Sequence, residues 1–207
     1  VLCGSLERTR LMYLIINRLG LFRPKKSLLH IAPEVGLFKM FSKVLLNYTP
    51  VDYNINQYIK WKPEVKFIDL CDVKSTVYKK FDLIILNHVL EHIPCSPSVT
   101  LSNLKSLLNT GGFIFFTIPV RLGVTTTEDL NPKLTKEERT KRFGQWDHLR
   151  IFGEKDFFEI LDPDKNIGVK QINYQEYLSE HCLQINNLTS KSCSNLSNSI
   201  LMIKSEI

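Results

Sequence analysis

The chain has 207 residues, a formal net charge of +6 at pH 7 and an isoelectric point near 9.0. With 43% hydrophobic and 23% charged residues, the composition excludes an intrinsically disordered chain and fits one folded domain over residues 1–207. The basic charge permits an anionic partner. However, the densest basic group, within 133–142, is interleaved with Glu137 and Glu138, which indicates a solvated helix face rather than a nucleic-acid site.

The apolar runs and the cysteines bear on where the protein works. The longest runs, such as 113–120, are too short to span a bilayer, and charged residues interrupt the first twenty positions, so we expect a cytoplasmic protein without a membrane span. The chain begins with Val, which suggests a part of a larger multidomain chain. Its cysteines are odd in number and scattered without a C-x-x-C pair, which predicts buried thiols rather than disulfides or a zinc site: Cys3, Cys71, Cys95, Cys182 and Cys193.

The first half of the chain alternates helical and extended patterns. An amphipathic pattern over 6–20, within an N-terminal segment 1–24, predicts a leading helix. A short apolar strand at 28–31 is followed by a turn at 32–36 and a second helix. The further expected elements are strands at 50–53, 65–70, 81–87 and 113–120, and a helix at 98–108 that ends at the Asn-Thr-Gly-Gly sequence of 109–112.

The second half is less regular. Residues 121–150 are polar and long for a connection, which predicts a lid or substrate loop. A helix at 154–161 and closing strands at 169–174 and 199–204 follow, and the Ser/Asn-rich stretch 186–198 is expected to be a flexible connection. The whole pattern predicts an α/β fold: a Rossmann-like, doubly wound, mostly parallel seven-stranded sheet with one antiparallel closing strand.

Polar residues stand where the predicted strands end, which is where parallel sheets bind ligands. The turn at 32–36 leaves backbone N–H groups free, and the Glu34 carboxylate can meet an ammonium or a hydroxyl. Asp52 follows about 20 residues later, the spacing at which dinucleotide folds place a ribose-binding acid. The alternatives to a ligand-binding role are an ordinary turn at 32–36 and, for Asp69 and Asp72 after the strand at 65–70, a helix cap or turn.

Five stretches in order resemble the class I S-adenosylmethionine-dependent methyltransferases: HIAPEVG, VDY, IDLCD, FDLIILNHVLEHI and LLNTGGFIFFTIP, within about residues 25–205. A second piece, Thr127-Glu128-Asp129 followed by Arg139 and by FGQWDHLRIFG at 143–153, is similar to a branch of small methyltransferases associated with polysaccharide synthesis. The missing start methionine and the domain length suggest a further resemblance, to the C-terminal domain of a viral multidomain glycan-assembly protein that methylates rhamnose. Pro33 in place of the central glycine and Tyr53 after Asp52 depart from the usual family pattern.

The resemblance implies that S-adenosylmethionine is the cofactor. It implies that Glu34 faces the ammonium group, that Asp52 accepts from the ribose hydroxyls, and that Asp69 accepts from the adenine amino group. The remaining implied cofactor residues surround the methionine part, the ring edge or the sulfonium: Ala32, Pro33, Gly36, Tyr53, Leu70, Asn87 and His88.

Methyl transfer to a hydroxyl gains from a general base, and histidine suits this role near neutral pH. We expect His148 to be that base, assisted by Asp147 and Glu128, with Arg150 positioning the acceptor. The alternatives are His88 or His92 as the base, and a His148 that merely hydrogen-bonds the backbone. Two neighbours of these candidates have expected roles as well: Glu91 together with His92 caps and orients a loop, and Trp146 either stacks on a sugar ring or shields the site.

We therefore expect an O-methyltransferase acting on a sugar or glycan. No metal is expected, although Glu128, Asp129 and Asp147 are a candidate cation set. The alternatives are methylation of RNA or protein, which the basic charge permits, and a non-catalytic module with a methyltransferase fold. An NAD-dependent dehydrogenase is disfavoured because the glycine fingerprint and a Tyr-x-x-x-Lys pair are both missing.

Overall fold

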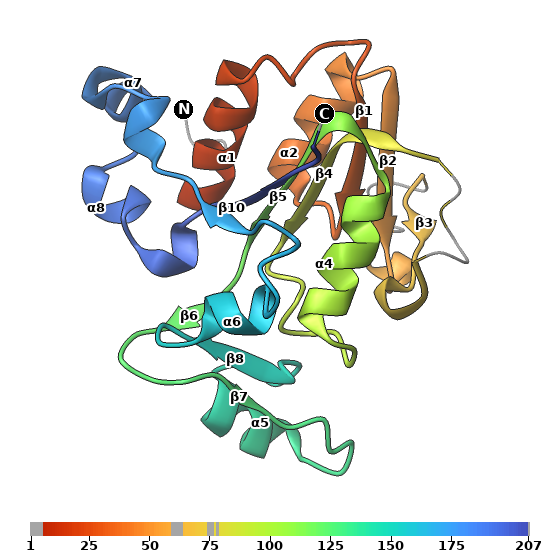
Figure 1. Ribbon diagram of the computed structural model, residues 1–207, viewed down its shortest axis with the longest axis vertical. Coiled ribbons are helices and arrows are strands. Elements are labelled where there is room, and N and C mark those ends of the chain that lie inside the picture. Colours follow the sequence, from red (N-terminus) through yellow and green to blue (C-terminus); the bar gives the residue numbers. More distant parts are fainter. Residues whose placement is uncertain (1–5, 59–63, 74–76, 78, 207) are drawn as a thin grey trace.

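A seven-stranded sheet and a three-stranded sheet organise the chain in the computed structural model, which describes residues 6–58, 64–73, 77 and 79–206. The large sheet has the order β3-β2-β1-β4-β5-β10-β9 (Figure 1). Its strands are β1 (Ser27–Ile31), β2 (Asn47–Asp52), β3 (Lys66–Phe67), β4 (Phe81–Asn87), β5 (Leu108–Thr117), β9 (Lys170–Gln171) and β10 (Leu201–Lys204).

The strand directions confirm the predicted fold class. Strands β1 to β5 pair in parallel, and β10 alone runs against its two neighbours, β5 and β9. All carboxyl ends of the five parallel strands therefore meet at one edge of the sheet. The strands at 65–70 and 169–174 are shorter than predicted, at two residues each.

The two faces of the large sheet are covered by different helices. In β4, Leu83 and Ile85 belong to the apolar cluster that also contains residues of α1 (Glu7–Arg18), α2 (Val35–Val44), α7 (Glu180–Ile185) and α8 (Ser190–Cys193). Ile84 and Leu86 belong to the cluster with residues of α4 (Pro97–Ser106) and α6 (Phe157–Leu161). This alternation explains the continuous apolar sequence of β4, because both faces of the strand are buried. Each fully buried side chain contributes about 1.5–3 kcal/mol, which makes the sheet a rigid support for its carboxyl edge.

The glycine pair after α4 has a different role from the one predicted. The helix begins with the Ser96 cap and Pro97 and ends at Ser106, and residues 109–112 lie inside β5, where the register with β4 shifts. A Cβ at Gly112 would lie 2.9 Å from the carbonyl oxygen of Asn109. The Asn-Thr-Gly-Gly sequence therefore forms a bulge, and the prediction that it ends the helix is wrong.

The segment 121–150 contains more regular structure than predicted. It contributes β6 (Val120–Arg121), β7 (Thr127–Glu128), α5 (Lys136–Phe143) and the start of β8 (Arg150–Gly153). The order of the small sheet is β6-β8-β7, and the sheet lies below the large one with α5 beneath it (Figure 1). A capping box of Thr135 and Glu138 begins α5, and Gly144, with φ of 87°, ends it. We call residues 121–150 the lid segment.

The C-terminal part also departs from the prediction. Residues 186–198 include α8 and the 3-10 helix η4 (Leu196–Asn198) instead of an irregular connection. The remaining short helices are η1 (Ile55–Tyr58), η2 (Leu70–Asp72) and η3 (Tyr174–Glu176). Among the described residues, the helices are all too short or too polar to cross a membrane.

Candidate active site

Two residues at the carboxyl edge of the sheet have backbone conformations that are rare for side chains other than glycine. Ala32 follows β1 with φ of 49°, and His88 follows β4 with φ of 52°. Backbone hydrogen bonds hold both positions: the Ala32 N–H donates to the Val51 oxygen and the His88 N–H to the Thr117 oxygen, each at 2.9 Å. Such conformations on two neighbouring strands are typical of functional sites.

The structure brings Glu34 and Asn87 together, as the resemblance implies. The Glu34 carboxylate accepts hydrogen bonds from Asn87 Nδ2 at 2.9 Å and from Thr9 Oγ1 at 3.0 Å, and Arg8 Nη2 lies 3.4 Å away. This cluster joins α1, the turn after β1 and the end of β4. Because the Glu34 side chain remains partly exposed, the carboxylate is accessible to an ammonium group. Beside it, Pro33 is buried in the turn and Gly36 lies in the first turn of α2.

Asp52 ends β2 as predicted, but protein groups already occupy its oxygens. The carboxylate accepts from the Asn54 N–H at 2.7 Å, Gln57 Nε2 at 3.0 Å and the Tyr58 hydroxyl at 2.7 Å. Burial, together with the Asp52 contact, raises the pKa of Tyr58, so the phenol stays protonated and donates. A ribose at this position would have to exchange with or add to these contacts. The neighbouring Tyr53 is exposed and packs against the Phe67 ring at 5.5 Å.

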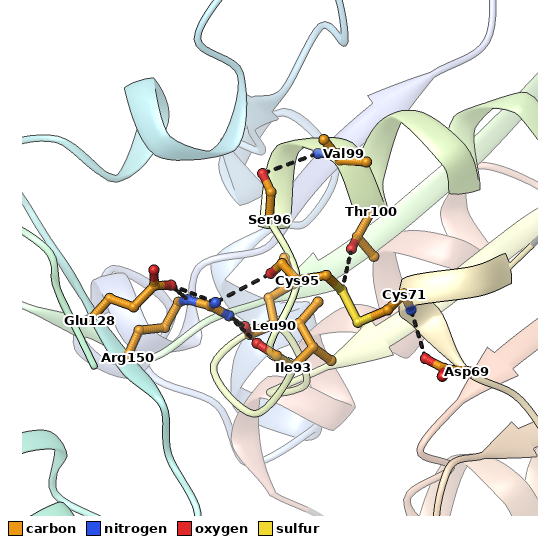
Figure 2. Close-up of a disulfide and its surroundings, with 10 residues drawn as sticks. All are labelled: Asp69, Cys71, Leu90, Ile93, Cys95, Ser96, Val99, Thr100, Glu128 and Arg150. Atoms are coloured by element: carbon orange, nitrogen blue, oxygen red, sulfur yellow. Dashed lines mark hydrogen bonds and ion pairs between the residues drawn. A yellow bond between two sulfur atoms is a disulfide. The ribbon is translucent and has the colours of Figure 1, made fainter. Parts of the chain in front are cut away.

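One of the two carboxylate oxygens of Asp69 makes the capping contact that was the alternative to adenine binding. Its Oδ1 accepts from the Cys71 N–H at 2.8 Å and begins η2, in which Leu70 is buried. Cys71 is joined to Cys95 by a disulfide with a Cα–Cα distance of 5.6 Å (Figure 2). The bridge ties η2 to the loop before α4.

The disulfide corrects the prediction for two of the cysteines. Cys71 and Cys95 are not buried thiols, whereas Cys182 and Cys193 are free. Cys3 lies outside the described residues. The bridged pair is 24 residues apart in sequence, and only the tertiary pairing of β3, β2, β1 and β4 brings the two loops together.

Arg150 is a structural anchor. Its side chain is 1% exposed and donates to the carbonyl oxygens of Leu90, of Ile93 at 2.7 Å and of Cys95 at 3.2 Å. Its Nη2 lies 2.5 Å from Oε2 of Glu128, whose side chain is 44% exposed (Figure 2). Since carbonyl and carboxylate oxygens of the protein surround the guanidinium, the prediction that Arg150 positions the acceptor is corrected: Arg150 and Glu128 attach the lid segment to the loop after β4.

The candidate cation set of three acids does not converge. Glu128 pairs with Arg150, Asp129 pairs with Arg142 at 2.5 Å, and Asp147 lies beside His92. The three carboxylates thus have three separate partners.

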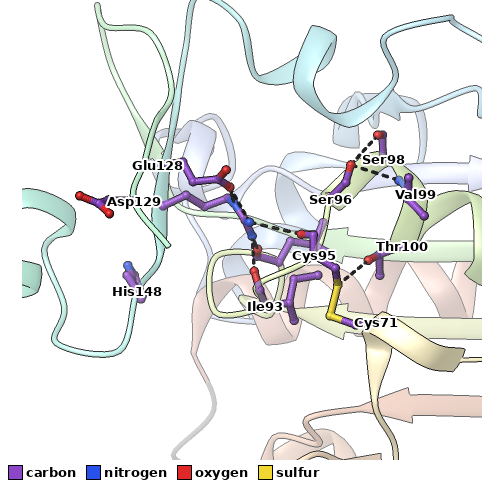
Figure 3. A network of polar contacts seen from close by, with 12 residues as sticks. Cys71, Ile93, Cys95, Ser96, Ser98, Val99, Thr100, Glu128, Asp129 and His148 are labelled. Atoms are coloured by element: carbon purple, nitrogen blue, oxygen red, sulfur yellow. Dashed lines mark hydrogen bonds and ion pairs between the residues drawn. A yellow bond between two sulfur atoms is a disulfide. The ribbon is translucent and has the colours of Figure 1, made fainter. Parts of the chain in front are cut away.

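His148 lies instead in a compact cluster with Glu91 and His92. The His92 and His148 rings meet edge to face, with centroids 4.7 Å apart, and one ligand atom from each of the three residues lies within 4.8 Å of the others. His148 Nδ1 donates to the Phe143 carbonyl at 3.2 Å, so in the neutral ring Nε2 is free of a proton. Figure 3 shows His148 on the lid segment, apart from the network around Glu128 and Cys95.

Burial controls the charge of His148. Desolvation, followed by the neighbouring His92, lowers the pKa of the His148 imidazole below its usual value. The ring is therefore neutral near pH 7 and able to accept a proton. Its backbone is held by Arg139, whose Nη1 donates to the His148 carbonyl at 3.2 Å. His148 thus combines a free nitrogen with a fixed position, although it also makes the backbone hydrogen bond that was its alternative role.

Glu91 is the residue that sequence reasoning underestimated. Its side chain is 0% exposed, and within the described part of the chain neither oxygen accepts a hydrogen bond. The nearest groups are His88 Nδ1 at 3.2 Å and His92 Nε2 at 3.9 Å from Oε1. Glu91 and His92 were expected only to cap a loop, yet their side chains meet the histidine of the lid segment. The available signal was the H-x-x-E-H spacing directly after a buried strand.

The cofactor implied by the resemblance fits part of this edge. A partly exposed carboxylate, Glu34, is held beside Asn87 at the turn after β1, which suits an ammonium group. The carboxylates of Asp52 and Asp69 are in the predicted places but have partners within the protein. Glu91, the first member of this cluster, is four residues after Asn87, so acceptor chemistry and cofactor binding would share the end of β4 and the loop that follows it.

A model of a known family and several solved structures match the chain. The family model described as a methyltransferase domain matches residues 6–162. A comparison with curated proteins finds no match.

Among solved structures, the plantazolicin methyltransferase BamL, in complex with a triazolic desmethylPZN analog and SAH, has a TM-score of 0.59 at 15% identity, covering 97% of this chain and 85% of that one. Burkholderia thailandensis 1,6-didemethyltoxoflavin-N1-methyltransferase has a TM-score of 0.55 at 14% identity, with 97% and 79% covered. Haemonchus contortus phosphoethanolamine N-methyltransferase 2, in complex with S-adenosyl-L-methionine, has a TM-score of 0.55 at 14% identity, with 96% of this chain covered; the chain spans only 53% of that protein. At these identities the likeness shows a shared fold.

Proposed function

Because the chain belongs to the class I S-adenosylmethionine-dependent methyltransferase family, we propose that it is an O-methyltransferase that methylates a hydroxyl of a sugar or glycan, such as rhamnose. The bound cofactor supplies a methyl group on a positively charged sulfur. The protein's own task is to hold the acceptor oxygen against that methyl group, to exclude water and to remove the hydroxyl proton.

The observation that carries the proposal is the buried, neutral imidazole of His148. A sugar hydroxyl is a weak nucleophile at neutral pH, and a positioned base accelerates its reaction by about 10²–10⁴-fold. The free Nε2 of His148 and the lowered pKa of its ring meet this need. In this proposal Asp147 orients His92 through contacts at Nδ1, 3.3 Å from its carbonyl oxygen and 3.5 Å from Oδ2.

A sugar acceptor is supported by Trp146, two residues before His148. Its side chain is 53% exposed, which fits a stacking surface better than a shielding role. Lys136 Nζ lies 4.6 Å from the ring centroid and covers part of it. We expect Trp146→Ala to raise KM for the acceptor while leaving the affinity for S-adenosylmethionine unchanged, as measured by calorimetry and initial rates.

The cofactor roles at the sheet edge are part of the proposal. Glu34 binds the ammonium group, and Asn87 and His88 lie near the sulfur. Asp52 takes the ribose hydroxyls, with Tyr53 beside it, and Asp69 meets the adenine. The turn residues Ala32, Pro33 and Gly36, together with Leu70, line the same site. Asp52→Ala is expected to weaken cofactor binding first, before it affects turnover at saturating cofactor.

The experiment that tests the function offers methyl-labelled cofactor with a panel of sugars, nucleotide-sugars, glycan fragments, RNA and proteins, and then locates the label by mass spectrometry. We expect the label on a sugar oxygen. Label on a nitrogen, on RNA or on a protein would contradict the proposal. Cofactor binding without any transfer would leave a non-catalytic module.

We also infer a cytoplasmic location. The Cys71–Cys95 disulfide is the opposing observation for the location, because disulfides persist mainly in oxidising compartments. Trapping the thiols during lysis and counting them by mass tests the location. Cys71 and Cys95 trapped as thiols would agree with a cytoplasmic location, with the bridge forming only after lysis, whereas a bridge already present in the cell would contradict it.

A further inference from the structure

We propose that Glu91, His92 and His148 form a binding site for one divalent transition-metal ion, between the loop after β4 and the lid segment. Two independent observations support this site: a fully buried carboxylate that accepts no hydrogen bond from the described residues, and two imidazoles whose Nδ1 atoms are already held by carbonyl oxygens.

The first observation is the state of the Glu91 carboxylate. It is fully buried, and none of the described residues donates a hydrogen bond to either oxygen. A buried carboxylate that accepts no hydrogen bond is costly, so native structures compensate it with a paired cation or a metal. The groups around it are nitrogens of His88, His92 and His148, which bind metals in their neutral form.

The second observation is the orientation of the two imidazoles. His148 Nδ1 is held by the Phe143 carbonyl at 3.2 Å, and His92 Nδ1 by the Asp147 carbonyl at 3.3 Å. In both rings Nε2 is then the nitrogen free to ligate. Metal-binding histidines commonly donate their other N–H to a carbonyl or a carboxylate in this way, which fixes the tautomer and the ring plane.

The spacing of the three groups suits one ion. Their ligand atoms lie within 4.8 Å of one another. Bonds near 2.1 Å set the ligands of one ion roughly 3.4–4.2 Å apart, so small side-chain rotations close the set around a metal. Leu149 N–H donates to the Glu91 carbonyl at 2.9 Å and keeps the lid segment against the loop.

Two imidazoles and one carboxylate select the class of ion. This ligand set suits Zn²⁺, Mn²⁺, Fe²⁺ or Co²⁺, whereas Mg²⁺ prefers oxygen ligands. Three protein ligands leave coordination positions open, as in catalytic sites. The sequence predicted no metal here because Glu91 and His92 read as a loop cap, and His148 is more than fifty residues away.

The inference deepens the proposed function by giving the cation a role there, but cation binding itself does not depend on methyl transfer. In the metal-loaded protein, Nε2 of His148 is a ligand. A bound cation would supply Lewis acidity toward the acceptor hydroxyl, so that its proton would pass to water rather than to the imidazole.

The test titrates chelator-treated protein with Co²⁺ and follows its visible absorption, with Zn²⁺ and Mg²⁺ as competitors. We expect one Co²⁺ per chain, displaced by Zn²⁺ and not by Mg²⁺. His148→Ala, His92→Ala and Glu91→Gln should each weaken binding by at least tenfold, and Asp147→Asn by a smaller factor. His181→Ala, which removes an exposed histidine of α7, is the matched control and should bind Co²⁺ like the unmodified protein.

Absence of Co²⁺ binding, or equal binding by the three ligand variants and the unmodified protein, would overturn the inference. Circular dichroism and urea unfolding show whether a variant has lost Co²⁺ binding because it no longer folds. Such a variant is set aside, and the ligand variants that still fold decide whether the site exists. The two proposals fail separately: Co²⁺ binding without methyl transfer to sugars removes only the proposed function, and methyl transfer that persists in chelator without Co²⁺ binding removes only the metal site.

Discussion

Two buried polar side chains, Arg150 of β8 and Glu91, lie at the loop after β4, and they differ in how far their hydrogen bonds are satisfied. The Arg150 guanidinium donates to three carbonyl oxygens, those of Leu90, Ile93 and Cys95, and pairs with Glu128. The Glu91 carboxylate, in the same loop, accepts no hydrogen bond from the described residues. Its neighbours are imidazole nitrogens of His88 and His92, 3.2 and 3.9 Å from Oε1.

The contrast distinguishes a structural buried charge from a functional one at this edge of the sheet. A saturated buried charge fixes one segment against another and leaves nothing for a ligand. An unsaturated buried charge costs stability and persists where a substrate, proton or ion completes it. From the sequence we expected the reverse: a functional Arg150 at the acceptor and a structural Glu91 in a loop cap.

The largest effect is expected from His148→Ala. Loss of the base, or of a metal ligand in its place, should lower turnover by about 10²–10⁴-fold while cofactor affinity stays unchanged. Initial rates and calorimetry measure the two quantities, and His181→Ala serves as the control. Unchanged turnover would move the role to His88 or to another group of the cluster.

Arg150→Met tests the saturated centre. It leaves three buried carbonyl oxygens without their donor, so the free energy of unfolding should fall by about 3–5 kcal/mol, and proteolysis within the lid segment should accelerate. Glu128→Gln is the matched variant: its side chain is 44% exposed, so a change below about 1 kcal/mol is expected in urea unfolding. Equal effects of both variants would contradict the anchoring role of the carbonyl contacts.

The disulfide stabilises the same loop covalently. Its removal shows how much the covalent bond contributes to stability compared with the hydrogen bonds of Arg150. Replacing Cys71 and Cys95 together by Ser should lower the free energy of unfolding by about 3 kcal/mol, the value expected for a loop of this length. Urea unfolding with and without reductant measures this effect. A reductant that destabilises the double variant as strongly as the unmodified protein would show that the bridge is not the cause.

The smallest effect concerns His30, a buried histidine of β1 that is held by the Tyr48 hydroxyl at 2.8 Å. Burial lowers its pKa to about 3, so the unfolded chain binds a proton that the folded chain does not. The contribution of His30 to the free energy of unfolding is therefore complete above the ordinary pKa of 6.5. It is lost as pH falls toward 3, and the free energy of unfolding should drop by about 2 kcal/mol between pH 7.5 and 5.0. His30→Phe combined with Tyr48→Phe should remove this part of the pH dependence in urea unfolding, and an unchanged slope would contradict it.

The large sheet was predictable because its signals are local. The apolar run of 81–87 and the turn at 32–36 identify two central strands, and parallel pairing then brings Glu34 and Asn87 together. The small sheet was not, because β6 and β7 have two residues each and carry no periodicity. The disulfide and the Glu91–His148 contact were missed for one reason: both join segments that only the folded sheet brings near each other.

The most direct test of the central claim, that the unsatisfied Glu91 marks the acceptor site, is a paired measurement on Glu91→Gln. Urea unfolding and turnover are measured on the same preparation, with the acceptor found in the labelling panel. We predict a free energy of unfolding equal to or above that of the unmodified protein, because a buried charge is removed, together with turnover at least about 100-fold lower. Unchanged turnover with a loss of stability of several kcal/mol would contradict the account, because Glu91 would then be a structural group like Arg150.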